Sequence, residues 1–158
     1  MLHRLHRKLR DLMAQSPIST TPSAGNNEQL SLPLASAILL FEVAWADHNV
    51  SAAEEAALKH ALIKLHDLSD ENAQQILVAS REQHRDSVGV YPYTRLLNDS
   101  LSKAEKFELM VQLWSLALVD DGLDQFEEHR IRAIAELIYV EHADFIAAKQ
   151  QARARAQP

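Results

Sequence analysis

The chain has 158 residues, a formal net charge of −6 and no cysteine, so disulfides, thiolate zinc sites and cysteine nucleophiles are excluded. Its length suits one domain with tails, and three Gly and five Pro leave few of the tight turns that a multi-stranded sheet needs. The composition therefore predicts an all-α protein, and the net charge of −12 on residues 16–147 disfavours nucleic acid as a partner.

Residues 1–15 form a basic segment with a net charge of +3. Its leucines recur at helical spacing, which predicts a short amphipathic helix: Leu2, Leu5, Leu9 and Leu12. Such a helix can lie on an anionic membrane surface or dock on a partner. A terminal helix that frays or packs back on the domain is the simpler interpretation, because a helix this short is marginal alone.

Residues 16–32 are rich in Ser, Thr, Pro, Asn and Gly, which predicts a flexible linker. We expect the folded domain to span residues 33–150, with Pro33 in the first turn of a helix, and residues 151–158 to form a tail. The longest apolar runs, 34–46 and 109–119, fall short of the roughly 18 to 20 residues that a membrane-spanning helix needs. We therefore expect a soluble, cytoplasmic protein.

The domain has helical spacing throughout, which predicts a bundle of six or seven helices. Four polar residues precede helical runs and are predicted N-caps: Ser51, Ser69, Ser102 and Asp124. The segment around Gly89 and Pro92 predicts a break followed by a short helix. The large aromatic residues follow the apolar phase and are interpreted as core residues, not a ligand pocket: Phe41, Trp45, Phe107 and Trp114.

An internal repeat becomes visible when the sequence is shifted by 73 residues. The shift places residues 38–58 on residues 111–131, with Leu40 on Leu113 and Asp47 on Asp120. It also places the pair of glutamates at 54–55 on the pair at 127–128 and keeps the apolar phase that follows. Helical periodicity alone can align apolar positions, but the aligned acids favour a duplication.

Some of the acidic residues in the repeat occupy positions that suit a helix cap. Ser51 with Glu54, and Asp124 with Glu127, have the spacing of a capping box, in which side chains bind the free N–H groups of a helix start. Negative side chains are also favourable there because the helix N-terminus carries partial positive charge.

Capping does not account for Asp47, Asp120 and Asp121, which follow the ends of apolar helices, where free carbonyl groups disfavour a carboxylate. A loop N–H, an arginine or a bound cation would compensate them. An Asp followed by a capping residue four positions later and a Glu seven positions later brings together the oxygen ligands that Ca²⁺ or Mg²⁺ prefers. The spacing is not that of an EF-hand loop.

Histidines supply no clear metal or catalytic motif. His48, His129 and His142 lie near the acidic segments, but no HExxH pattern is present. His60 and His66 are expected on partly exposed helix positions. Because the sequence also has no Gly-rich phosphate loop and no nucleophile elbow, we expect a protein that is not an enzyme.

Four stretches carry a family resemblance: "AWADHNVSAAEEAAL", "YPYTRLLN", "LALVDDGLDQFEEHRIRAIAEL" and "HADFIAAKQQAR". Together, over residues 33–150, they resemble the TerB-like domain of bacterial proteins related to tellurite resistance protein B. The resemblance implies an all-helical domain with pseudo-twofold duplication and a recurring acidic turn. It also implies divalent metal binding by these acids and a role in membrane-linked stress-response complexes or beside chaperone modules.

The family's turn has a Gly directly after each Asp, and this chain departs from that pattern. His48 and Asp121 occupy those positions, with Asn49 and Gly122 one residue later. Because Asn and Gly tolerate left-handed backbone, we expect each turn to persist with its kink shifted by one residue. Ser51 stands where the second half has Asp124, so the second half is the expected stronger metal site.

The resulting hypothesis is a non-enzymatic TerB-like domain that binds a divalent cation of the Ca²⁺ or Mg²⁺ type in a response to tellurite or another stress. The predicted ligands are Asp120, Asp121, Asp124 and Glu127, with Asp47 and Glu54 as the symmetric partner site. We expect protein partners, including a membrane-associated stress complex, which would place the protein at the cytoplasmic side of the inner membrane. The alternative is a metal-independent module that recruits proteins or a membrane surface.

Overall fold

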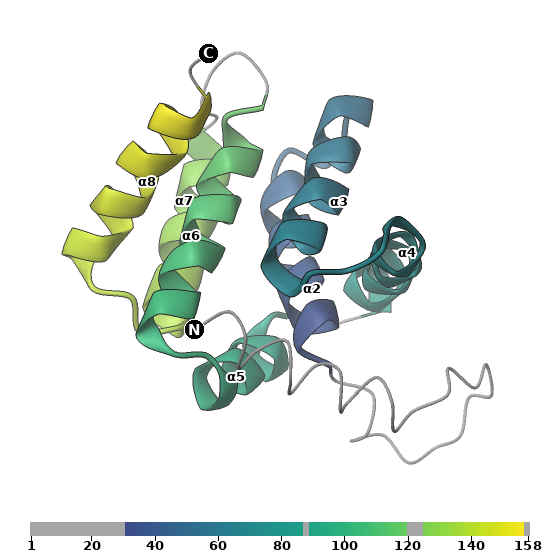
Figure 1. The fold of residues 1–158 in the computed structure, drawn as a ribbon, viewed down its shortest axis with the longest axis horizontal. Helices are drawn as coiled ribbons and strands as arrows, with labels where there is room; N and C mark the ends of the chain where they lie inside the picture. Colours follow the sequence, from purple (N-terminus) through teal and green to yellow (C-terminus); the bar gives the residue numbers. More distant parts are fainter. Residues whose placement is uncertain (1–30, 87–88, 120–124, 157–158) are drawn as a thin grey trace.

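The computed structural model describes residues 31–86, 89–119 and 125–156. These residues form seven α-helices and no strand, in agreement with the predicted all-α class (Figure 1). The helices are α2 (Leu32–Ala44), α3 (Ala52–His66), α4 (Asp70–Asp86), α5 (Tyr91–Ser100), α6 (Lys103–Ala117), α7 (Gln125–Leu137) and α8 (His142–Ala156). Among them no helix is long and apolar enough to cross a bilayer.

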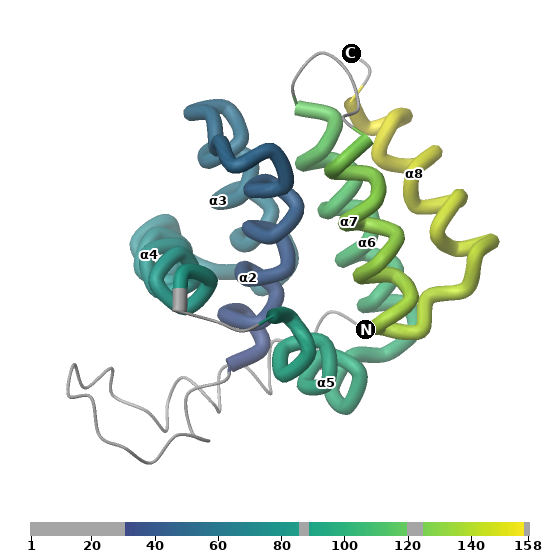
Figure 2. The backbone as a smooth tube through the Cα atoms, turned by 180° about the vertical axis from the view of Figure 1, so that it is seen from behind, coloured from purple at the N-terminus to yellow at the C-terminus, as the bar shows by residue number. Residues whose placement is uncertain are grey.

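Two central helices, α2 and α6, organise the bundle. Helix α2 packs on α3 and α4, helix α6 packs on α7 and α8, and the two central helices contact each other. Helix α5 lies across the end of the bundle at which α2 and α6 begin, as the two opposite views show (Figures 1 and 2). The bundle therefore consists of two groups of three helices, with α5 as the connection between them.

The core is built largely from the central helices. Helix α2 is buried on nearly all sides, because its sequence is apolar around the whole helix and not on one stripe only. The largest fully buried side chains of α6 include Leu109, Leu113 and Trp114. A helix that is apolar all round is stable only when other helices cover every side, which is the position that α2 occupies.

The helix boundaries repeat with the spacing that the sequence predicts. A shift of 73 residues moves Ala52 at the start of α3 to Gln125 at the start of α7, and Ala44 at the end of α2 to Ala117 at the end of α6. The third helix of each group differs in direction: α4 is seen almost end-on in Figure 1, whereas α8 runs alongside α6 and α7. The duplication therefore includes the order of the helices and the boundaries between the first and second helix of each group, but not every helix length or packing angle.

The predicted N-caps within the described residues are confirmed. Ser51 Oγ accepts a hydrogen bond from the Glu54 N–H at 3.1 Å, and Ser69 Oγ accepts one from the Asn72 N–H at 3.1 Å. Ser102 forms a full capping box with Glu105. The fourth predicted cap, Asp124, lies outside the described residues. Helix α5 follows the predicted break at Gly89, whose φ is +130°.

Two predictions about burial are wrong. Trp45 was expected in the core but is 38% exposed, because α2 ends at Ala44 and the apolar phase of the helix no longer applies beyond it. The Trp45 ring instead stacks on Phe41 with ring centroids 6.1 Å apart. His66 was expected on a partly exposed position but is only 4% exposed, because it continues the buried face of Leu58, Leu62 and Leu65. Phe41 and Trp114 are buried as predicted, and Phe107 is half-buried against the core.

Polar contacts fix α8 to α6. Arg155 donates two hydrogen bonds to the Glu108 carboxylate, at 2.8 and 3.4 Å, and Gln112 donates a third at 3.1 Å. The Lys149 Nζ lies 4.9 Å from the centre of the Trp114 ring, and Phe145 meets the same ring edge-on at 5.1 Å. Such bidentate and cation–π contacts add direction to an otherwise apolar interface.

Candidate metal centre

The α2–α3 turn and the start of α7 belong to the same end of the bundle. Helices α2 and α6 both run away from α5, so the α2–α3 turn and the neighbouring ends of α6 and α7 lie at the end opposite α5 (Figures 1 and 2). Helix α2 also contacts both α6 and α7. Among the described residues, this arrangement places Asp47 and Glu54 of the first half and Glu127 of the second half at one end of the domain.

In the first half, Asp47 is compensated by the backbone. Its Oδ1 accepts a hydrogen bond from the Asn49 N–H at 3.1 Å, and its side chain is exposed. This is an Asx-type turn, the first of the three compensations that the sequence allowed. The position of Asp47 after a helix end is thereby accounted for without a cation.

The turn after Asp47 contains a left-handed residue, but not where the sequence predicted it. His48 has a φ of +63°, whereas Asn49 does not have a positive φ. In the first half the predicted shift of the kink by one residue is therefore wrong, and His48 adopts the conformation at the position where the family has Gly. Gly122, the corresponding prediction in the second half, lies outside the described residues. The Asn49 N–H is instead held by Asp47, which fixes the residue next to the kink.

Glu54 is held at the start of α3 and is only 5% exposed. The Ser51 hydroxyl accepts a hydrogen bond from the Glu54 N–H and lies 3.3 Å from Glu54 Oε1, to which it can donate. The predicted pairing of Ser51 and Glu54 at the helix start is present.

In the second half, Glu127 is the predicted ligand that the structure describes, since Asp120, Asp121 and Asp124 lie outside the described residues. Glu127 is 8% exposed, at the position equivalent to Glu54. The neighbouring Glu128 accepts a hydrogen bond from Lys149 of α8 at 3.2 Å. The two adjacent glutamates thus differ: one points into the domain, and the other joins α7 to α8.

The burial of Glu54 and Glu127 is more than a capping role requires. Glu105 has the same position in the capping box of α6 but is only half-buried. Removing a carboxylate from water is unfavourable unless other groups compensate it. Both halves of the repeat bury a carboxylate at the third residue of the second helix, and neither carboxylate lacks a partner.

A family comparison agrees with the resemblance of the sequence. The family model described as tellurite resistance protein TerB matches residues 33–150. The chain belongs to the TerB family. Comparisons with curated proteins and with solved structures gave no significant match.

In this TerB domain, the described residues do not complete a metal site. Across residues 31–86, 89–119 and 125–156, no three His, Asp or Glu side chains come together as possible ligands. His48 meets the Trp45 ring edge-on at 5.9 Å, and His142 stacks on Phe145 at 6.1 Å. Oxygen ligands from the segment 120–124 would therefore be needed beside Glu127.

A polar cluster near this end was missed by the sequence reasoning. Glu42 of α2 contacts His84 of α4 and Arg130 of α7, and thereby joins three helices. The side chains of Glu42 and His84 are both largely buried. One signal was available, because Glu42 is the only charged residue in the apolar run 34–46. Its partners lie 42 and 88 residues away, so sequence spacing could not identify them.

Proposed function

We propose that this TerB domain is a non-enzymatic divalent cation-binding module of the Ca²⁺ or Mg²⁺ type, acting in a response to tellurite or a related stress. Asp120, Asp121, Asp124 and Glu127 form the principal site, and Asp47 with Glu54 forms a weaker one. The observation that carries the proposal is the burial of equivalent carboxylates, Glu54 and Glu127, each of which follows an acidic stretch of the sequence.

Oxygen-only ligands support a hard cation over zinc. The proposed ligands are carboxylates, which Ca²⁺ and Mg²⁺ prefer, and the chain has no cysteine. The second half has three Asp in five residues, whereas the first half has Asp47, which already accepts the Asn49 N–H. The second half is therefore the stronger site in this proposal.

The proposal is tested by calorimetric titration of the metal-stripped full chain with Ca²⁺, Mg²⁺, Mn²⁺ and Zn²⁺. Loss of one ligand in Asp120→Asn should weaken binding by roughly tenfold or more, while Asp47→Asn should have a smaller effect. The matched control is Asp99→Asn, an exposed aspartate of α5 at the opposite end of the domain. The metal-binding proposal is wrong if the dissociation constant of every ion exceeds about 1 mM, or if Asp120→Asn binds the ions as tightly as the parent does.

A metal-independent interaction module is the second candidate, and exposed aromatic side chains favour it. Helices α2 and α7 run antiparallel, and Glu42 contacts Arg130. One turn beyond that contact, towards the end opposite α5, lie Trp45 directly after α2 and Phe126 on α7, which are 38% and 57% exposed. Exposed aromatic rings beside carboxylates are typical of a protein-binding surface. If no ion binds in the metal titration, the interaction module becomes the favoured function.

A further inference from the structure

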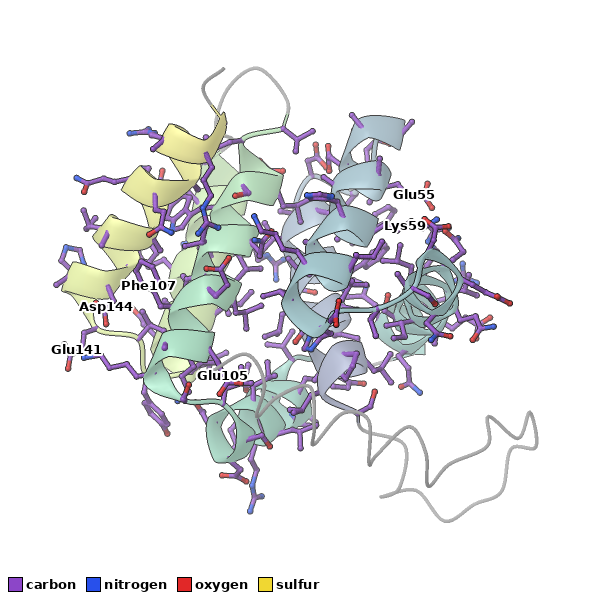
Figure 3. All side chains as sticks on the ribbon, in the orientation of Figure 1. Glu55, Lys59, Glu105, Phe107, Glu141 and Asp144 are labelled. Atoms are coloured by element: carbon purple, nitrogen blue, oxygen red, sulfur yellow. The ribbon has the colours of Figure 1, made fainter. Side chains whose placement is uncertain are left out.

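A hollow of about 200 Å³ lies between the first turn of α6 and the connection from α7 to α8. On α6, Lys103, Lys106 and Phe107 line it from one helix face, as their spacing of three and four residues requires. Tyr139 and Asp144 lie on the other side. Figure 3 shows Phe107 and Asp144 together where α6 faces the start of α8. This is the end of the bundle opposite the candidate metal centre, so the hollow is independent of the proposed function.

The rim of the hollow carries a tyrosine in a conformation that favours glycine. Helix α7 ends in a Schellman motif, in which the Tyr139 N–H donates to Glu136 O at 3.3 Å and the Val140 N–H donates to Ala135 O at 2.9 Å. Tyr139 occupies the left-handed position of this motif, with a φ of +57°. Its side chain is 79% exposed, so packing does not offset the strain. Strain at an exposed aromatic residue on the rim of a cavity points to a contact with a ligand.

The two lysines of the hollow differ in their ion pairs. The Lys103 Nζ lies 3.9 Å from Glu141 Oε2 and 3.7 Å from Asp144 Oδ2, so both acidic side chains of the hollow contact Lys103. Lys106 is half-buried and has no ion pair or hydrogen bond from its side chain within the described part of the chain. An anionic group on a ligand would therefore meet the Lys106 ammonium.

The remaining surface of the hollow is apolar. Phe107 and Val140 are both half-buried against the core and present a rigid hydrophobic wall. The volume is below the roughly 300 to 1,000 Å³ of sites for drug-sized ligands, so the occupant is small. We infer that this hollow binds a small carboxylate with an apolar group, placing the carboxylate on Lys106 and the apolar group between Phe107 and Tyr139. A free organic acid and the C-terminal residue of a peptide share this chemistry.

The test is an NMR titration of the ¹⁵N-labelled full chain with three probes. They are 3-phenylpropanoate, the neutral 3-phenylpropanamide, and N-acetylphenylalanine as a mimic of a peptide C-terminus. Both carboxylates should give saturable shifts of the backbone N–H signals of residues 103–107 and 139–144. The neutral 3-phenylpropanamide should bind at least about tenfold more weakly. Tighter binding of N-acetylphenylalanine would identify a peptide terminus as the source, and tighter binding of 3-phenylpropanoate a free acid.

Variants separate the binding role from a structural one. Lys106→Gln should remove the preference for a carboxylate over the amide probe, whereas Lys59→Gln on α3 should leave it unchanged. Tyr139→Gly should raise the melting temperature by relieving the backbone strain and weaken all three probes, a combination that a purely structural residue would not give. The inference is overturned by the absence of saturable shifts up to about 10 mM, by equal binding of carboxylate and amide, or by unchanged binding in Lys106→Gln.

Discussion

The two halves of this TerB domain share their helix pattern but attach their third helix by different ion pairs. In the first half, α4 is joined to α2 by Glu42 and His84, with Arg130 of the other half as a further partner. In the second half, α8 is joined to α6 by Glu108 and Arg155, and by contacts to Trp114. Both attachments centre on a glutamate, but Glu42 and Glu108 do not occupy equivalent positions of the repeat.

Each half places a cation of its third helix over the equivalent ring, Arg81 over Phe41 and Lys149 over Trp114, but the ion pairs have no counterpart across the repeat. Ser115 stands at the position equivalent to Glu42, where its hydroxyl donates to Val111 O at 2.8 Å, and Ala35 stands at the position equivalent to Glu108. Apolar positions such as Leu40 and Leu113 do correspond, and both are fully buried. The comparison shows that the halves share an apolar framework and that each has its own ion pairs.

The largest expected effect is on this shared framework. Leu40→Ala and Leu113→Ala each remove a fully buried side chain from a central helix, so each should lower the free energy of unfolding by about 2 to 5 kcal/mol. Urea denaturation of both variants measures the two losses. If the halves are packed equivalently, the two losses of free energy should agree within about 1 kcal/mol. A larger difference would show that the two central helices are not packed equivalently.

A smaller effect is expected at the turn of the first half. His48→Gly should raise the free energy of unfolding by about 0.5 kcal/mol, because Gly adopts a positive φ without strain, although it adds entropy to the unfolded chain. Asn49→Gly is the matched control and should destabilise the domain by a similar amount, because Asn49 does not have a positive φ. The opposite order of stability in denaturation curves would mean that the kink lies at Asn49.

The smallest expected effect is a loss of stability at acidic pH that arises in the second half, at Glu108. Burial alone would raise the pKa of the Glu108 carboxyl, but hydrogen bonds from Arg155 and Gln112 and the charges of Arg155 and Lys64 lower it below its ordinary value of 4.5. The stabilisation from this lowered pKa is complete above about pH 4.5 and is lost as the pH falls through the pKa of the folded state.

Melting temperatures between about pH 7 and pH 3 measure this contribution. Glu108→Gln should be destabilised near neutral pH and should approach the parent as the pH falls, while the exposed Glu136→Gln on α7 controls for loss of a surface charge. If the difference in melting temperature between the parent and Glu108→Gln stays constant across this pH range, Glu108 does not contribute to the loss of stability in acid.

Local patterns were sufficient to predict the helices. The caps at Ser51, Ser69 and Ser102 and the break at Gly89 depend on neighbours within a few residues, so the sequence contains the needed information. Trp45 was mispredicted because helical phase was extended by one residue beyond the end of α2. Helical periodicity predicts burial only for residues within a helix.

The candidate site was harder to predict because it depends on contacts between distant segments. The cluster of Glu42, His84 and Arg130 joins three helices, and no local motif records such a meeting. The left-handed conformation of His48 was also missed, since residue preference points to Asn49 and the surrounding turn decides otherwise. The equivalence of Glu54 and Glu127 could be predicted from the repeat, but their burial could not.

The burial of α2 on nearly every side has a consequence for the duplication itself. A single three-helix unit would expose to water the side of α2 that α6 and α7 cover, and it could hide that side only against a second copy. Its folding would then depend on protein concentration, as in an obligate homodimer. Joining the two units through α5 holds each at a high effective concentration for the other. The fused chain can therefore fold at any dilution.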